Sequence, residues 1–463
     1  MAKLPHSDQD TIAAIATAPG RAGISVIRIS GNQALTIAQT LTAKPLKPRY
    51  ATLAELRNQN GKLLDEAIVI YYPAPHSFTG EHVVELQGHG GHVLINRLLQ
   101  EVVRLGARIA APGEFSQRAF LNDKIDLTQA EAIADLIDAG SEAAADNALM
   151  SLQGGFKKHI EQLLQQIIEI RVYVEAAIDF PEEEIDFLSD GKVERALEAI
   201  IEQLISTENK AQQGALLKEG IRVVIAGRPN AGKSSLLNAL SERESAIVTD
   251  IAGTTRDVLH ETIQIDGLPI QITDTAGIRD TEDPVEKIGV ARAKQELEKA
   301  QVILVLLDSK LLSISEGNLE QVCDQELQHL GLTELASDKL CFIVNKIDLT
   351  TLPEGRLSKQ RHVFALSAKT ETGLSTLKTF LKEKAGYQQA QEGLFTARAR
   401  HLNALARAKE SVLQALQQLR LYNAGELVAE DLRSAQEQLG EITGEFSNDD
   451  LLGEIFSSFC IGK

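Results

Sequence analysis

One short segment constrains this chain more than any other. Residues 227–234 read Gly-Arg-Pro-Asn-Ala-Gly-Lys-Ser and match the pattern G-x-x-x-x-G-K-[ST], directly after the strand-like segment 222–226, whose last four residues are aliphatic. In such a loop the glycines let backbone N–H groups curl around phosphate oxygens. Lys233 adds a cation at the terminal phosphates, and the Ser234 hydroxyl suits Mg²⁺. The segment therefore predicts a phosphate-binding loop between a strand and a helix.

The sequence around this loop alternates apolar strands with helices. Strands are expected at 222–226, 269–273, 302–307 and 340–344, and each is followed by a loop that carries polar residues. This alternation predicts a mostly parallel, doubly wound sheet, which binds ligands at the C-terminal ends of its strands. We expect this nucleotide-binding domain to span residues 218–387.

Four further motifs follow in the order expected of a GTP site. In Thr249-Asp-Ile-Ala-Gly-Thr-Thr255 a hydroxyl can reach the same Mg²⁺, and Asp274-Thr-Ala-Gly277 offers a carboxylate for the water shell of the metal. In Asn345-Lys-Ile-Asp348 the carboxylate of Asp348 can accept both edge donors of guanine, which adenine does not offer. Ser367-Ala-Lys369 completes a loop around the base. Together these motifs predict a Ras-like P-loop GTPase domain that binds GTP with Mg²⁺.

The residues predicted to bind GTP and Mg²⁺ lie in these motifs or directly beside them. Mg²⁺ is expected on Ser234 and Thr255. The GTP-binding residues are expected to be Asn230, Ala231, Gly232, Lys233, Ser234, Ser235, Thr249, Asp250, Ile251, Ala252, Gly253, Thr254, Thr255, Asp274, Thr275, Ala276, Gly277, Asn345, Lys346, Asp348, Ser367, Ala368 and Lys369.

One position departs from the Ras pattern. Ile278 stands where Ras-type enzymes keep a glutamine that orients the attacking water, and an aliphatic side chain cannot do that. Either the protein binds GTP without hydrolysing it, or another group orients the water. Glu286 is the nearest suitable carboxylate, although its sequence context also fits a solvated glutamate at a helix start.

The flanks of the nucleotide-binding domain differ from it and from each other. Residues 1–125 mix strands, expected at 24–30, 67–72 and 82–86, with a helix at 93–105, which predicts an α+β domain. Residues 126–217 lose the strand pattern, and Thr128-Gln-Ala-Glu131 predicts a capping box that opens a helix. Residues 388–463 are again helical. The fold class is therefore multidomain, α/β and α, although periodicity does not say whether the two helical flanks pack together.

Composition limits the other functions. The chain has 463 residues, 47 Lys+Arg against 65 Asp+Glu, and a formal charge of −18. Neutralising the phosphates of RNA or DNA needs clustered cations. The acidic balance therefore argues against a protein that binds nucleic acid through its own charge, although a basic partner could bring the nucleic acid to it. Cys323, Cys341 and Cys460 form no C-x-x-C pair, which argues against a disulfide framework and fits the cytoplasm. The apolar run at 302–307 is too short to span a bilayer.

Several stretches outside the nucleotide motifs resemble the bacterial tRNA-modification GTPases of the MnmE (TrmE) family. They are Pro19 to Gly31, Ser77-Phe-Thr-Gly80, Glu85 to Gly91, Pro112 to Lys124 and the C-terminal Phe459-Cys-Ile-Gly-Lys463. The resemblance covers essentially the whole chain. It implies an N-terminal folate-binding and dimerising domain, a discontinuous helical domain, and a GTPase domain inserted between its two parts.

The resemblance also implies an activity and partners. Family members work with the FAD-dependent MnmG to add an aminomethyl or carboxymethylaminomethyl group at C5 of the wobble uridine of certain tRNAs, with a reduced folate as one-carbon donor. Their GTPase domains pair in the GTP state with K⁺ bound, which activates hydrolysis. Family members are homodimers that form through their folate-binding domains.

Carried over by motif, the resemblance assigns roles to particular residues. It implies that Glu286 orients the attacking water. The folate ligands would be Arg28, Glu85, Lys124 and Lys463; the K⁺ ligands would be Asn230, Thr249, Ile251 and Thr254; and Cys460 would be a thiol close to the folate.

Other interpretations of these residues stay open at the level of sequence. Cys460 is either a reactive thiol or a small buried residue. His82, His89 and His92 suggest a metal cluster by spacing, but no Cys or acidic ligand accompanies them, so shaping of the glycine-rich loop is the simpler interpretation. The whole chain fits either an enzyme of tRNA modification or a GTP-controlled RNA-binding or ribosome-assembly factor without base chemistry. The second would need a basic RNA-binding domain, and neither flank is strongly basic.

Overall fold

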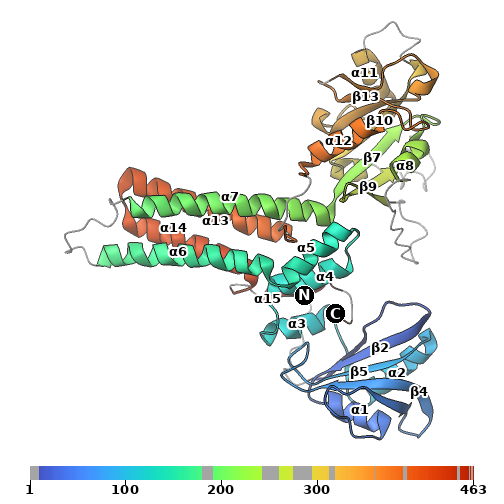
Figure 1. Ribbon diagram of the computed structural model, residues 1–463, viewed down its shortest axis with the longest axis vertical. Helices are drawn as coiled ribbons and strands as arrows, with labels where there is room; N and C mark the ends of the chain where they lie inside the picture. Colours follow the sequence, from blue (N-terminus) through green and yellow to red (C-terminus); the bar gives the residue numbers. More distant parts are fainter. Residues whose placement is uncertain are drawn as a thin grey trace. The chain divides into compact units, whose positions relative to one another are not determined.

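The computed structural model describes residues 10–179, 191–241, 260–274, 295–311, 319–358, 360–388, 394–445, 449–457, 459 and 462. Within these residues the chain forms two compact units (Figure 1). The first comprises Met1–Ala134, Ser151–Glu202 and Ala404–Lys463, and the second comprises Asp135–Met150 and Gln203–Asn403. In the part of the chain described, no helix is long and apolar enough to cross a bilayer.

The first unit contains a six-stranded sheet in the order β3-β4-β5-β2-β1-β6. Neighbouring strands are antiparallel except β1 and β6. The strands predicted at 24–30, 67–72 and 82–86 are confirmed as β2, β4 and β5, whereas the other three were not predicted. The strands are β1 (Ile12–Ile15), β2 (Ala22–Ser30), β3 (Thr52–Arg57), β4 (Leu63–Tyr72), β5 (Val83–Gly90) and β6 (Arg108–Ile109).

Alternation along β2 separates the two faces of this sheet. Ile27 and Ile29 are fully buried and pack with helices α1 (Ala34–Thr42) and α2 (His92–Arg104). Because successive side chains of a strand point to opposite faces, Arg28 lies on the other face. There, Phe115 of α3 (Glu114–Leu121) packs with Ile12, Ala14 and Ala110 of the sheet region. The face beside α3 therefore carries this apolar cluster together with Arg28.

The two helical flanks of the sequence pack together in the first unit. Helix α6 (Gly155–Asp179) runs along α14 (Gly425–Thr443), as Figure 1 shows. Arg420 of α13 (Ala399–Tyr422) pairs with Glu194 at 2.6 Å, and with Glu198, on α7 (Lys192–Glu219). Side chains more than two hundred positions apart are thus ion-paired, which periodicity alone did not predict. The helical flanks of the sequence also contain α4 (Leu127–Ile137), α5 (Glu142–Leu152) and α15 (Asp449–Ser457), of which most of α5 belongs to the second unit.

The predicted capping box is wrong by two residues. Helix α4 begins at Leu127, so Thr128 lies inside its first turn. The Asp126 carboxylate accepts the Gln129 N–H at 3.0 Å, and the Gln129 side chain accepts the Asp126 N–H at 3.1 Å. This is the reciprocal arrangement of a capping box, with Asp126 as the cap. Aspartate competes well with threonine for this position because its carboxylate also favours the helix dipole.

The second unit contains a seven-stranded sheet in the order β12-β13-β11-β10-β7-β9-β8. The five inner strands are parallel, and the two outer strands β8 and β12 are antiparallel to their neighbours. The four strands predicted from sequence are β7, β9, β10 and β11, whereas β8, β12 and β13 were not predicted. The strands are β7 (Ile221–Gly227), β8 (His260–Ile265), β9 (Leu268–Asp274), β10 (Val302–Asp308), β11 (Leu340–Asn345), β12 (Gly355–Ser358) and β13 (Val363–Ala365).

Helices cover both faces of this sheet. Helices α8 (Lys233–Ser241) and α12 (Leu374–Ala385) pack on the face that carries Val223 and Ile225 of β7. Helix α11 (Leu319–Leu330) packs on the face that carries Val224 and Ala226. The doubly wound arrangement puts the C-terminal ends of the parallel strands, and the loops after them, along one edge.

Candidate functional site

The phosphate-binding loop joins the end of β7 to the start of α8. Gly227 and Gly232 have φ values of 154° and 99°, and Asn230 has a φ of 67°, conformations that side-chain-bearing residues seldom adopt. The Lys233 ammonium donates to the carbonyl oxygens of Gly227 at 3.0 Å and Arg228 at 3.3 Å. The backbone is therefore curled as the motif predicts, and Lys233 is folded back over the loop.

Asn345, at the end of β11, connects three of the predicted loops. Its Nδ2 donates to the carbonyl oxygen of Ala231 at 3.0 Å, and its Oδ1 accepts the N–H groups of Lys346 at 2.8 Å and Ala368 at 3.0 Å. The side chain is buried. A side-chain carbon on Gly232 would lie 2.3 Å from the same Nδ2, so only glycine fits there. The phosphate loop and the two base-binding loops are thus held by one amide.

Lys346 connects the base-binding loop to the phosphate loop a second time. Its ammonium donates to the carbonyl oxygen of Asn230 and to the Asp308 carboxylate, both at 2.7 Å. Burial alone would raise the pKa of Asp308, but the hydrogen bonds from Lys346 and from the Lys310 N–H hold it below its usual range. Sequence analysis missed Asp308. Its place at the carboxyl end of an apolar parallel strand is the signal that could have found it.

Asp348 lies where a base-reading carboxylate is expected. The Ser367 hydroxyl donates to its Oδ1 at 2.6 Å, and the Ser367 N–H donates to the carbonyl oxygen of Thr372 at 3.0 Å. Ser367 is fully buried, so it fixes the carboxylate from the protein side. Lys369 follows in the same loop and is exposed.

A large part of the predicted nucleotide site lies outside the described residues. Asp274 ends β9, and only its backbone is described, whereas Ser234 and Ser235 lie in the first turn of α8. The predicted residues outside the described ranges are Thr249, Asp250, Ile251, Ala252, Gly253, Thr254, Thr255, Thr275, Ala276, Gly277 and Glu286, together with Cys460 and Lys463.

An ion pair between the partly exposed Arg228 and the buried Glu326 fixes the outer side of the phosphate loop. The Arg228 Nε donates to both oxygens of Glu326 on α11, at 2.8 and 3.1 Å, and Glu326 is 2% exposed. These two residues help to line a cavity of about 250 Å³ that also includes Asp308 and Lys346. Sequence analysis did not single out Glu326, because its only signal is a charged residue on the apolar face of a helix.

The first unit brings together two of the four predicted folate residues. Arg28 of β2 and Glu85 of β5 are direct partners across the strands, and the guanidinium donates to Glu85 Oε1 at 3.0 and 3.1 Å. The Arg28 guanidinium lies 5.5 Å from the ring centre of Phe78 and 5.8 Å from that of Phe115. The face of the sheet beside α3 thus carries an ion pair whose guanidinium lies close to two aromatic rings. Sequence analysis did not predict either ring as part of the site.

Two further observations concern the other predicted folate residues. Lys124 is exposed, and a side-chain carbon on Gly80 would lie 3.4 Å from its Cγ. Gly462, with φ of 96°, is buried, and a side-chain carbon there would lie 2.5 Å from the carbonyl oxygen of Ile15. Ile15 pairs with Ile27, the neighbour of Arg28. Gly462 therefore lies against the end of β1, the strand next to the one that carries Arg28.

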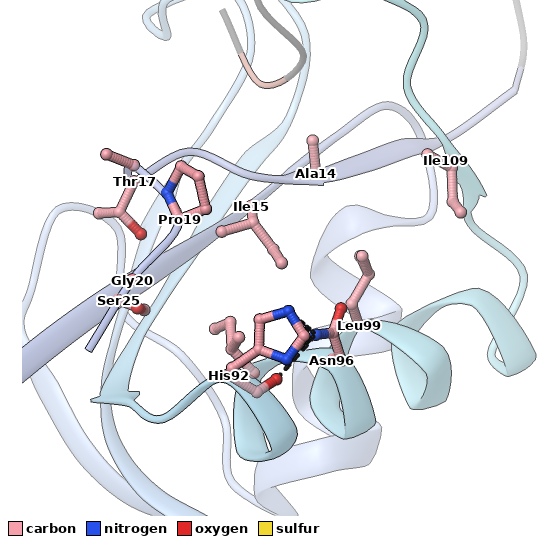
Figure 2. A pocket seen from close by; sticks show the side chains of 12 residues that line it. Ala14, Ile15, Thr17, Pro19, Gly20, Ser25, His92, Asn96, Leu99 and Ile109 are labelled. Atoms are coloured by element: carbon pink, nitrogen blue, oxygen red, sulfur yellow. Dashed lines mark hydrogen bonds between the residues drawn. The ribbon is translucent and has the colours of Figure 1, made fainter. Parts of the chain in front are cut away.

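A separate cavity of about 260 Å³ lies between helix α2 and the segment that follows β1 (Figure 2). Figure 2 shows His92 and Asn96 on the helix side and Thr17 and Pro19 on the other. Asn96 donates to the carbonyl oxygen of His92 at 2.7 Å. Of the predicted folate residues that the structure describes, which are Arg28, Glu85 and Lys124, none lines this cavity.

The three histidines of the glycine-rich region have separate partners. The His82 ring stacks on Tyr71, and His89 Nδ1 lies 2.7 Å from the carboxylate of Asp65. His92 lies beside Asn96. Within the described ranges, no three His, Cys, Asp or Glu side chains are grouped to hold a metal ion.

A curled glycine loop, tied through Asn345 to an Asn-Lys-Ile-Asp loop at the C-terminal edge of a parallel sheet, defines a P-loop GTPase. Two family models together match most of the chain. The model described as GTP-binding protein TrmE N-terminus matches residues 11–124, and the MnmE helical domain model matches residues 127–460.

Several relatives are similar to this chain over its full length. The tRNA modification GTPases MnmE of Marinobacter nauticus and Vibrio cholerae are each 55% identical over 458 residues, which is 98% of this chain and 99% of each relative. That of Saccharophagus degradans is 56% identical over 461 residues, again 98% and 99%. The chain belongs to the tRNA modification GTPase MnmE family. This membership decides for a GTPase of tRNA modification over a ribosome-assembly factor.

Among solved structures, the G domain of the T. maritima FeoB iron transporter matches 36% of this chain and 98% of its own length. It is 26% identical with a TM-score of 0.26, a score too low to bear on the fold.

Proposed function

We propose that this chain is the GTP-hydrolysing component of an enzyme that modifies C5 of the wobble uridine in tRNA. It adds an aminomethyl or carboxymethylaminomethyl group, takes its one-carbon unit from a reduced folate, and acts in the cytoplasm with the FAD-dependent partner MnmG. The names of the full-length relatives support the tRNA and GTPase parts of this proposal. The folate part rests on the N-terminal sheet.

The observation that carries the folate proposal is the Arg28–Glu85 pair between two aromatic rings. A carboxylate such as Glu85 can accept the amino and ring N–H donors of a pterin, and the partly exposed ring of Phe78 can contact its flat surface, whereas Phe115 is fully buried and supports the Arg28 guanidinium from within. A cation such as Lys124 suits the carboxylates at the other end of a folate, while Arg28 holds Glu85 in place at the pterin end. Lys463 follows Gly462, which lies beside the same sheet, and would add a third cation.

The nucleotide part of the proposal rests on donor chemistry. Ser234 starts α8 beside Lys233, so its hydroxyl and that of Thr255 would hold Mg²⁺ at the phosphates, where the ion would neutralise developing charge. Asn230, Thr249, Ile251 and Thr254 would supply amide, hydroxyl and carbonyl oxygens, the ligands that a hard cation such as K⁺ prefers. Glu286 would orient the attacking water in place of the glutamine that Ile278 replaces.

The assembly proposed for this function has four segments. Residues 1–125 form the folate-binding and dimerising domain, 126–217 and 388–463 the helical domain, and 218–387 the GTPase domain. In a homodimer, the GTPase domains would pair in the GTP state with K⁺ bound.

Replacing K⁺ with Na⁺ is then expected to slow hydrolysis and weaken the pairing of the GTPase domains, measured by steady-state phosphate release and by light scattering. Equal rates in both salts would remove the K⁺ site.

Calorimetric titration of the intact chain with a reduced formyl-folate tests the proposal. The wild type is expected to bind. Lys124→Ala is expected to lose binding because it removes a cation for the folate carboxylates, and Arg28→Ala because it removes the partner that orients Glu85. Arg57→Ala is the matched control, since Arg57 is an exposed arginine of the same sheet whose ion pair with Glu55 lies on edge strand β3. No binding by the intact chain would contradict the folate assignment.

A further inference from the structure

A largely buried guanidinium lies behind the proposed folate face. Arg118 of α3 is 12% exposed, and it contacts three carboxylates. One terminal nitrogen donates to both oxygens of Glu81 at 3.0 and 3.1 Å, and the other donates to Asp10 at 2.7 Å and Glu114 at 3.0 Å. Arg108 bridges Asp10 and Glu114 from the other side. None of these five residues belongs to the predicted folate set.

The Arg118 contacts reach the segment Ser77–Glu81, which carries Phe78. Glu81 accepts the Ser30 hydroxyl at 2.6 Å, and Ser30 lies 2.7 Å from the Thr79 hydroxyl. Ser30 and Thr79 are fully buried. Asn122, just after α3, donates to the carbonyl oxygen of Thr79 at 2.7 Å. The segment is therefore held from β2, from α3 and from the residue that follows α3.

This segment and the end of α3 together carry three parts of the proposed folate face. Phe78 lies against the Arg28 guanidinium, and Gly80 lies against Asn122 and Lys124. A side-chain carbon on Gly80 would lie 3.0 Å from Asn122 Cβ, so the two segments approach as closely as a glycine allows. If the Arg118 contacts are lost, Phe78 and Lys124 are no longer fixed relative to Arg28.

We propose that Arg118 is a positioning residue for the folate face, acting through Glu81 and the segment Ser77–Glu81 without touching the ligand. This inference rests on the proposed folate function and adds to it a residue that controls affinity from behind the site. Lysine cannot replace Arg118, because a single ammonium cannot span the Glu81 carboxylate and the Asp10–Glu114 pair at once.

The test compares folate affinity and folding in the same variants of the full-length protein. Arg118→Lys is expected to weaken binding of a reduced formyl-folate by about tenfold. GTP hydrolysis in the absence of tRNA is expected to stay unchanged, because the GTPase site is a separate unit of the chain. Asn122→Ala removes one hydrogen bond from an exposed residue, so it keeps the fold and is expected to weaken folate binding in the same direction. Arg57→Ala is again the control. Unchanged folate affinity in both variants would overturn the inference.

A double-variant cycle separates positioning from general destabilisation. In a Phe78→Leu background, Arg118→Lys is expected to cost less folate affinity than in the wild type, because part of what Arg118 holds in place has been removed. Additive losses, or losses that follow the melting temperature alone, would show a purely structural role and overturn the inference. If the wild type itself fails to bind folate, the proposed function falls. If the wild type binds and Arg28→Ala does not, only the Arg118 inference is at stake.

Discussion

Replacing Asn345 with alanine is expected to separate the phosphate loop from the base-binding loops. The amide makes three hydrogen bonds, to the Ala231 carbonyl oxygen and from the N–H groups of Lys346 and Ala368. Alanine makes none of them, and the side chain is 2% exposed, so water does not readily substitute. Three loops of the proposed nucleotide site then lose their common anchor.

The magnitude follows from the count of bonds. A hydrogen bond of this kind contributes about 1 kcal/mol net, so losing three costs about 3 kcal/mol. If these bonds arrange the loops for the nucleotide, this corresponds to roughly a hundredfold weaker binding, at about 1.4 kcal/mol per factor of ten. Part of the cost also lowers the stability of the domain without nucleotide, so the hundredfold figure is an upper bound.

Titration with a fluorescent GDP analogue, alongside thermal unfolding, measures both parts. Asn238→Ala is the matched control, because Asn238 is an exposed asparagine of α8 in the same domain and alanine has the higher helix propensity. It is expected to leave nucleotide affinity unchanged. If Asn345→Ala unfolds more easily but binds the analogue as well as the wild type does, the amide supports the fold and does not arrange the site, and the reasoning is refuted.

Three other predictions concern separate parts of the chain. Glu286→Ala is expected to lower GTP turnover by orders of magnitude with GTP affinity nearly intact, and a matching loss of affinity in nucleotide titrations would indicate a structural role. Asp348→Asn is expected to weaken GTP and favour xanthosine nucleotide in competition binding; an unchanged guanine preference contradicts the base-reading assignment. Burial would raise the pKa of Glu114, but hydrogen bonds from Arg108, the Ala111 N–H and Arg118 hold it below its ordinary value of 4.5. A lowered carboxyl pKa stabilises the fold at pH values above 4.5, and this stabilisation is lost as the pH falls through the folded pKa. Glu114→Gln is therefore expected to flatten the pH dependence of the free energy of urea unfolding below pH 4.5. An unchanged slope would contradict this expectation.

The parts of the fold that sequence predicted are those whose pattern is local. The loop at 227–234 is recognisable because its glycines, lysine and serine act through backbone geometry within eight consecutive residues. Strands such as β10 are recognisable because they are apolar throughout and buried on both faces. The short edge strands β8 and β12 were missed because one pairs only within a hairpin and the other is four residues long and partly exposed.

The parts that sequence did not predict depend on pairing across the chain. Arg28 and Glu85 are 57 positions apart, and only the register of β2 with β5 places them opposite each other. The same is true of Asp308 with Lys346 and of the Arg118 contacts, since no periodicity encodes which charges meet. The resemblance to the MnmE family implies that Arg28 and Glu85 bind folate. Their pairing, and the two aromatic rings near Arg28, were found only in the structure.

The most direct test of the account is reconstitution of the modification from purified components. The chain, an FAD-dependent MnmG partner, unmodified tRNA, GTP and a reduced folate with an isotope-labelled one-carbon unit are combined, and the wobble nucleoside is analysed by mass spectrometry. The account predicts that the label appears at C5 of the uridine when GTP is hydrolysed, and that Arg28→Ala or a non-hydrolysable GTP analogue abolishes it. Modification that carries no label from the folate, or that proceeds equally without this chain, would contradict it.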